Sequence, residues 1–147
     1  MDQVESIDVF NTALEAGLRS VILLNEYYPK PIDFEGIVKL DYVLVYSKDF
    51  GGPESLHPSV PNRKGELAIR RELVRDGLGL MKRFGLIKIL CESEGIFYSV
   101  SGDAEPFIKL MKSEYSMTLK NNAEWCVAQL NQSSFQYFNR IFMDVAF

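Results

Sequence analysis

The stretch from Lys48 to Pro61 constrains the fold more than any other part of this sequence. It holds two glycines and three prolines in 14 residues, which breaks any helix or central strand. A connection of this length is long for a small domain, and such connections are often functional. Phe50, Leu56 and Val60 are apolar, so we expect the loop to pack down on the protein. The chain must therefore build separate elements on either side of an ordered loop.

Two helices are expected before the loop. Thr12 and Glu15 have the spacing of a capping box, and apolar residues recur at helical intervals from Leu14 to Leu24. Asp33 can cap a second helix. Its residues between Ile37 and Tyr46 are apolar on nearly every side, which is typical of a centrally buried helix.

After the loop, we expect a helix from Gly65 to Phe84, then a β-hairpin formed by residues 86–91 and 96–101. A fourth helix opens around Pro106 and is expected to break or kink at Asn121 and Asn122. The residues of the third helix expected to face the core are Ile69, Leu73, Gly77, Leu80 and Phe84.

This order of elements predicts a mainly α protein with a small β-hairpin, of the α+β class. Helix, helix, loop, helix, hairpin, helix is the order of a winged helix with a C-terminal helical extension. A chain of 147 residues, 47% hydrophobic, fits one domain. We expect residues 1–10 to be an extended lead-in, 11–130 a winged-helix-like domain and 131–147 an aromatic-rich, partner-docking segment.

Positive charge is concentrated in the third helix and the strand after it. The net charge is −4, yet eight of the 16 basic residues lie between Arg63 and Lys88, opposed by three acidic ones. On a helical projection four of them form a stripe about 40° wide, with Arg70 well off it. The stripe is either a solvated face, a contact for DNA phosphates or a contact for an acidic protein. The candidate contact residues are Lys64, Arg70, Arg71, Arg75 and Lys82.

The residue types needed for catalysis are scarce. His57 is the only histidine, and Cys91 and Cys126 form neither a CxxC pair nor a disulfide framework, so both are expected to be small buried hydrophobes. No glycine-rich phosphate loop follows Gly51 and Gly52. We expect no enzyme activity, metal or cofactor. No signal peptide or membrane span is evident, so a cytoplasmic location is expected.

The last 13 residues contain five aromatic side chains. One row of them can pack on the domain's own core, whereas the others would leave an apolar patch of the kind that marks an interface. The candidate docking residues are Phe135, Phe138, Ile141 and Phe142.

Three stretches together resemble a known family: residues 10–19, residues 40–42 with the loop 51–58, and residues 63–67 with 70–74. The chain resembles the middle component of bacterial three-component ABC-ATPase conflict systems, the group that includes Lamassu-type antiphage systems. The likeness covers residues 10–125. Its most specific part is the loop GGPESLHP leading into the helix that begins RKGEL.

The resemblance implies a non-enzymatic adaptor. Such a subunit would bridge an SMC-like ABC ATPase and an effector, often a nuclease, and hold the effector inactive until DNA is sensed. DNA contact, direct or through the complex, is part of this expectation. The alternative is an autonomous winged-helix DNA-binding transcriptional regulator. The motif residues given an architectural or contact role are Gly51, Gly52, Pro53, His57, Pro58, Arg63, Gly65, Glu66, Arg70 and Arg71.

Overall fold

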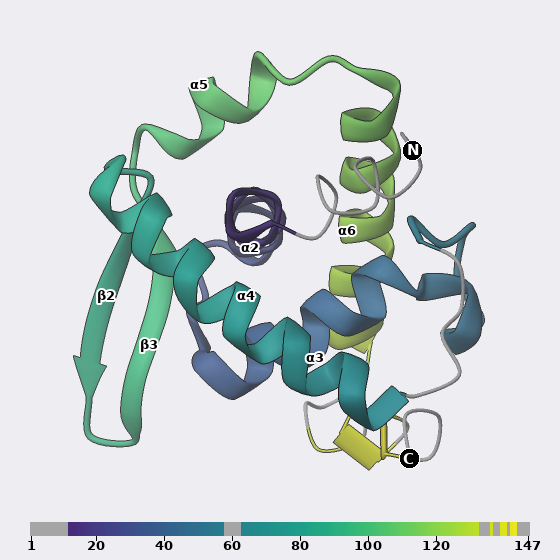
Figure 1. The fold of residues 1–147 in the computed structure, drawn as a ribbon. Coiled ribbons are helices and arrows are strands. Elements are labelled where there is room, and N and C mark those ends of the chain that lie inside the picture. Colours follow the sequence, from purple (N-terminus) through teal and green to yellow (C-terminus); the bar gives the residue numbers. More distant parts are fainter. Residues whose placement is uncertain (1–11, 58–62, 133–135, 137–138, 141, 144–147) are drawn as a thin grey trace.

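The computed structural model describes residues 12–57, 63–132, 136, 139–140 and 142–143 (Figure 1). The expected lead-in at residues 1–10 lies outside this part of the chain. The elements are helices α2 (Ala13–Tyr27), α3 (Phe34–Val45), α4 (Arg63–Arg83), α5 (Ala104–Lys109) and α6 (Glu114–Gln132), the 3-10 helix η1 (Ser47–Phe50), and strands β1 (Ile32–Asp33), β2 (Ile87–Glu92) and β3 (Gly95–Val100). The predicted class is confirmed, because the protein is mainly helical with a small antiparallel sheet.

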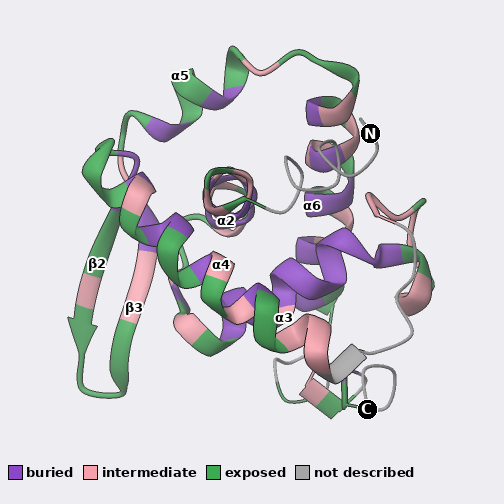
Figure 2. Cartoon of the chain, in the orientation of Figure 1, coloured by how far each residue is buried: buried purple, intermediate pink, exposed green. Residues whose placement is uncertain are grey.

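The first two helices begin at the predicted caps. The Thr12 side chain accepts a hydrogen bond from the backbone N–H of Glu15, and the Asp33 side chain accepts one from Gly36. Each bond satisfies an N–H that the first helical turn leaves unpaired. The α3 helix is buried on almost every side and forms the centre of the protein, as Figure 2 shows.

Helices α2 and α4 cross in direct backbone contact at two glycines. A Cβ atom on Gly77 would lie 2.5 Å from the backbone nitrogen of Gly17, and one on Gly17 would lie 2.7 Å from the carbonyl oxygen of Gly77. Both distances are shorter than any real Cβ contact, so the crossing requires glycine on both helices. The α4 helix is continuous through this point.

The buried face of α4 differs from the predicted one. Ile69 and Phe84, which were expected to face the core, are 55% and 61% exposed. Gly77 is buried as predicted, but the other buried positions of the described part of α4 are Arg70, Val74, Leu78 and Met81. The helix is therefore rotated by about one residue, roughly 100°, from the orientation that its apolar pattern predicts.

Strands β2 and β3 form the predicted hairpin, and β1 adds a short third strand. The sheet order is β1-β3-β2, with both pairings antiparallel. The strand Ile32–Asp33 was not expected, because two residues directly before a helix, the second of them its cap, give no strand pattern. Buried Ile32 lies opposite Tyr98 and joins the sheet to the core.

The helical segment after the hairpin breaks earlier than predicted. The α5 helix ends at Lys109 and α6 begins at Glu114 and continues through Asn121 and Asn122, so the break expected at the two asparagines is wrong. Leu110, the residue directly after α5, is 76% exposed beside the break. Asn122 is buried, and its side chain bonds to other elements.

Candidate functional site

The three stretches that carry the family resemblance meet inside the protein. Arg19 comes from α2, Asp41 from α3, His57 from the loop, and Glu66 and Arg70 from the start of α4. With Tyr46, which follows α3, they form one set of contacts that we call the polar cluster.

Arg19 and Asp41 form the deepest pair of the polar cluster. Arg19 Nε donates to Asp41 Oδ1 at 2.7 Å, and both side chains are fully buried. Burial by itself would lower the pKa of Arg19, but the charge of Asp41 and the hydrogen bond to it raise that pKa above its ordinary value. Arg19 therefore stays charged in the interior, and removing its partner would leave an uncompensated buried charge.

Arg70 joins α4 to this pair. Its Nε donates to Glu66 Oε2 at 2.8 Å, and its Nη1 lies 4.0 Å from Asp41 Oδ2. Its side chain has no exposed surface. This placement corrects the expectation that Arg70 contacts DNA or a partner, since its guanidinium is enclosed by the protein's own acids.

Tyr46 and His57 complete the polar cluster. The hydroxyl of Tyr46 donates to Glu66 Oε2 at 2.9 Å, and the guanidinium of Arg70 lies over the Tyr46 ring. His57 Nδ1 lies 3.1 Å from Arg70 Nη2. Burial, then the positive charges of Arg70 and Arg19, lower the pKa of His57 to about 4, so the imidazole is neutral at pH 7. Burial likewise raises the pKa of Tyr46 to about 12.

The motif loop, described over residues 51–57, is held by η1 and α6 as well as by the polar cluster. Ser47 Oγ donates to the carbonyl of Pro53 at 2.9 Å, and Asn122 Nδ2 donates to Ser47 Oγ and to the carbonyl of Glu54, each at 3.1 Å. A Cβ on Gly52 would lie 2.6 Å from the ring of Trp125, so that ring covers the loop backbone.

The remaining motif positions have simpler roles. Gly51 adopts a left-handed conformation with φ of 81° directly after η1, which a residue with a side chain rarely adopts. Gly65 is half-buried in the first turn of α4. Pro58 lies outside the described residues, as do the side chains of Arg63 and Lys64.

Two of the predicted stripe residues are already paired at the surface. Arg71 forms an ion pair with Glu35 at the start of α3, and Arg75 Nη1 lies 3.1 Å from Glu72. Both guanidiniums lie over the ring of Phe34. Lys82, near the C-terminal end of α4, is exposed. The described residues of the stripe thus lie at the protein surface, but Glu35 and Glu72 compensate part of their positive charge.

The aromatic end of the chain reaches the core through Phe142. Its side chain is buried, stacks on Phe50 at an interplanar angle of 9°, and meets Tyr42 edge-on. This packing corrects the expectation that Phe142 docks on a partner. Phe135, Phe138 and Ile141 lie outside the described residues.

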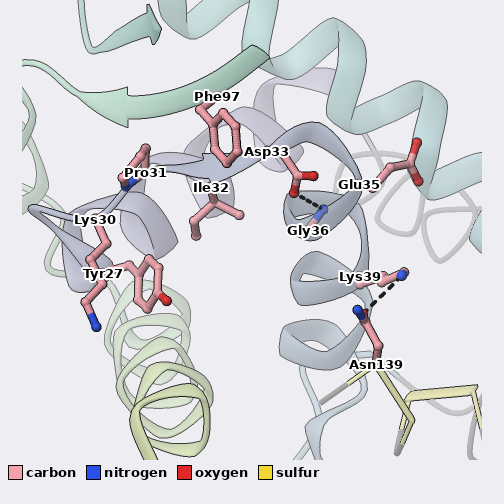
Figure 3. A pocket seen from close by; sticks show the side chains of 10 residues that line it. All are labelled: Tyr27, Lys30, Pro31, Ile32, Asp33, Glu35, Gly36, Lys39, Phe97 and Asn139. Carbon is pink, nitrogen blue, oxygen red and sulfur yellow. Dashed lines mark hydrogen bonds between the residues drawn. The ribbon is translucent and has the colours of Figure 1, made fainter. Parts of the chain in front are cut away.

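A surface pocket of about 490 Å³ lies beside β1 and the start of α3 (Figure 3). Lys39 Nζ donates to Asn139 Oδ1 at 3.0 Å on one side of it, and Lys30 lies over the Tyr27 ring on the other. The acids Asp33 and Glu35 also line it, and Asp33 is bound to the helix N-terminus. With two lysines and two carboxylates, the pocket favours no single class of charged ligand.

The described residues bring together no recognisable catalytic group. Cys126 is buried as expected, and burial raises the pKa of its thiol to about 12, whereas Cys91 is exposed, contrary to the prediction. No group of three or more His, Cys, Asp or Glu residues placed to hold a metal ion occurs in the described part of the chain. No helix found there is both long and apolar enough to cross a membrane.

Sequence reasoning missed Arg19, Asp41, Asn122 and Trp125 as members of this site. A signal was present for the first two. Arg19 interrupts the apolar run of α2, and Asp41 interrupts that of α3. Opposite charges in two helices that must be buried indicate a buried ion pair. Asn122 and Trp125 gave no such signal, because their partners lie about 70 residues away in the chain.

Comparison with known proteins gives one match. A family model described as "ABC-three component (ABC-3C) system Middle Component 2" matches residues 9–146. No curated protein and no solved structure matches the chain.

Proposed function

The chain belongs to the family of ABC-three component system Middle Component 2, and from this membership we propose that it is a non-enzymatic adaptor. In this proposal it bridges an SMC-like ABC ATPase and an effector, often a nuclease, in a cytoplasmic antiphage complex of the Lamassu type. It restrains the effector until the ATPase engages DNA. The family match over nearly the whole chain carries the proposal.

The use of the motif residues supports an adaptor over an enzyme. Three of the charged and polar motif side chains, His57, Glu66 and Arg70, contact one another inside the polar cluster. His57 is a poor general base there, since its lowered pKa leaves it weakly basic and its Nδ1 faces a guanidinium. The polar cluster as a whole fixes four segments relative to one another, and a fixed scaffold is what a bridging subunit needs.

We also propose that the domain is a winged helix, and the order of its elements supports this. Helix α2, strand β1, helices α3 and α4 and the hairpin β2–β3 follow one another with sheet order β1-β3-β2. In a winged helix the third helix presents the contact surface. That helix is α4 here, so we propose it as the surface that meets an acidic partner or DNA.

The contact residues that remain candidates are Lys64, Arg71, Arg75 and Lys82. The ion pairs of Arg71 and Arg75 are at the surface, where such pairs contribute at most about 1 kcal/mol. A partner's carboxylates or DNA phosphates can therefore replace Glu35 and Glu72 at little cost. Lys82 is exposed, and the ion pairs found among described residues do not include it.

Co-expression with the products of the neighbouring genes tests the adaptor role. We expect one defined complex in size-exclusion chromatography with light scattering, and effector activity that stays low until DNA and ATP are added. The double variant Arg75→Glu/Lys82→Glu should release or weaken one partner. Lys109→Glu/Lys112→Glu, an equal charge change in and after α5, should leave assembly intact.

The alternative gives a different result. A chain that stays apart from its neighbours and binds duplex DNA alone, with affinity falling steeply as salt rises, would be a DNA-binding regulator. That result would overturn the adaptor proposal.

A further inference from the structure

Strand β2 is an outer strand of the sheet. In the order β1-β3-β2 it pairs with β3 on one side only, and its other edge meets no further strand of the described chain (Figure 1). An open edge of six residues is a template for pairing with another strand.

The apolar face of the hairpin continues beyond the core. Opposite residues of an antiparallel pair lie on the same face, so Ile87, Ile89 and Cys91 share a face with Val100, Tyr98 and Ile96. At the inner end of this face Ile87 and Val100 are buried. Ile89 and Ile96, at the outer end, are 40% and 55% exposed, and Cys91 is exposed between them. Figure 2 shows this outer part of the hairpin in green.

Charge on the hairpin is divided between its two ends. The turn carries Glu92 and Glu94, whereas the opposite end carries Lys82, Arg83 and Lys88. All five are exposed, and the ion pairs found among described residues include none of them. The hairpin is thus acidic at its tip and basic at its base.

We propose that β2 pairs antiparallel with β2 of a second copy of this chain, about a two-fold axis at Leu90. The two apolar faces then lie on the same side of one continuous six-stranded sheet. Such a contact is isologous, meaning that the same surface serves both subunits, and this is the commonest way in which soluble proteins form dimers.

The charges select this register. Directly opposite residues must share a face of the sheet, so one residue of β2 has to lie opposite the same residue of the second copy, with the two-fold axis midway between them. Only the axes at Ile89 and Leu90 then pair five residues of β2 with β2 of the second copy. The axis at Leu90 places Lys88 opposite Glu92 of the second copy, twice by symmetry. The axis at Ile89 places Lys88 opposite Leu90 and leaves Glu92 unpaired.

The same register brings the two ends of the hairpin together. The acidic turn of each copy lies beside the basic base of the other, where Lys82 and Arg83 end α4. A strand of an unrelated protein would need to supply both charges in the correct order. The chain's own β2 already has them, which favours a second copy as the occupant of this edge.

This inference does not depend on the proposed function. A dimeric adaptor would place two copies in each complex. Of the α4 residues proposed to contact a partner, Arg75 is not used in the pairing, whereas Lys82 is shared by the two proposals. The experiment is therefore carried out on the full chain alone.

Sedimentation equilibrium with charge-swapped variants tests the pairing. We expect the wild-type chain to be mainly dimeric at roughly 100 µM, above the ~1–10 µM Kd of a small interface. Lys88→Glu and Glu92→Lys should each raise that Kd about tenfold or more, since each places like charges opposite one another. The double variant Lys88→Glu/Glu92→Lys restores opposite charges and should restore the dimer.

A disulfide tests the register itself. Ile89 lies opposite Cys91 of the second copy, so Ile89→Cys should form an intermolecular disulfide on mild oxidation. Ile89→Cys combined with Cys91→Ser is the matched control and should cross-link far less. A monomer at every concentration, a dimer that neither single charge variant weakens, or equal cross-linking in the control would each overturn the proposal.

Discussion

Nδ1 of His57 faces Nη2 of Arg70 at 3.1 Å, and this contact fixes the state of the imidazole. A guanidinium can only donate hydrogen bonds, so Nδ1 must accept and the ring must be neutral, with its proton on Nε2. The motif loop is thus joined to α4 through His57, which accepts a hydrogen bond from Arg70. Protonation would make the imidazole a cation, which the guanidinium of Arg70 would repel.

The contact of His57 with Arg70 predicts a loss of stability in mild acid. The pKa of His57 is about 4 in the folded protein, below its ordinary value of 6.5. Between these pH values the unfolded chain takes up a proton that the folded chain does not. The contribution of His57 to the free energy of unfolding should therefore be complete above about pH 6.5 and should decrease as the pH drops toward 4. Below pH 4 this group should cause no further loss of stability.

Urea titrations from pH 7 to 4.5, comparing wild type with His57→Asn, measure this effect. The sequence holds no other histidine. Burial raises the pKa of Glu15 and Glu26, which opposes the trend above pH 4.5, so the difference between the two proteins is the informative quantity. Equal pH dependence in both proteins would contradict the assignment.

Replacing Arg70 with methionine should destabilise the protein by about 3–5 kcal/mol, because the buried carboxylate of Asp41 and the nearby Glu66 lose a charged partner. Arg75→Met makes the same change at an exposed position of the same helix, where the surface ion pair contributes at most about 1 kcal/mol. Chemical denaturation of both variants gives the comparison. Similar losses in the two would mean that Arg70 is not enclosed by acids as described.

Two glycines of α4 predict opposite effects of one substitution. Gly77→Ala places a methyl group against the backbone of α2 and should cost more than about 2 kcal/mol through overpacking. Gly79 has open space around it, so Gly79→Ala should stabilise the helix by up to about 1 kcal/mol. Thermal unfolding distinguishes them, and a Gly77→Ala protein as stable as wild type would argue against the backbone contact.

Removing the side chain of Asn122 should loosen the motif loop locally. Asn122→Ala leaves the carbonyl of Glu54 and the hydroxyl of Ser47 without this donor, at a cost of about 1–3 kcal/mol. Hydrogen exchange or proteolysis should then increase first within residues 51–57. Asn121→Ala, at the exposed neighbouring position, should change neither. Exchange that rises evenly over the whole chain would place the role of Asn122 elsewhere.

Local signals predicted much of the fold. The Thr12 and Asp33 caps set the first two helices, and the hairpin strands lie within one residue of the expected ranges. Each of these features depends on bonds between residues close in the chain, so a single sequence is enough to reveal it.

Features that depend on distant partners were not predictable in this way. The orientation of α4 was wrong because an apolar pattern places arginine outside, whereas Asp41 and Glu66 make Arg70 a buried residue. The break predicted at Asn122 does not occur, because its side chain bonds to acceptors in the loop and at the end of α3, and a local pattern does not reveal these distant partners. For the same reason Phe142 could not be assigned to the core before Phe50 and Tyr42 were seen beside it.

Because the ring of Trp125 lies over Gly52, the substitutions that can be tolerated at either position depend on the residue at the other. Any side chain at 52 would occupy the space of the indole, so it is tolerable only after a smaller residue has replaced Trp125. That smaller residue, arriving first, would leave a cavity over the loop. Either single step is thus costly and the two together are less so, which is strong epistasis. Substitutions at positions 52 and 125 should therefore be found together among descendants of this protein.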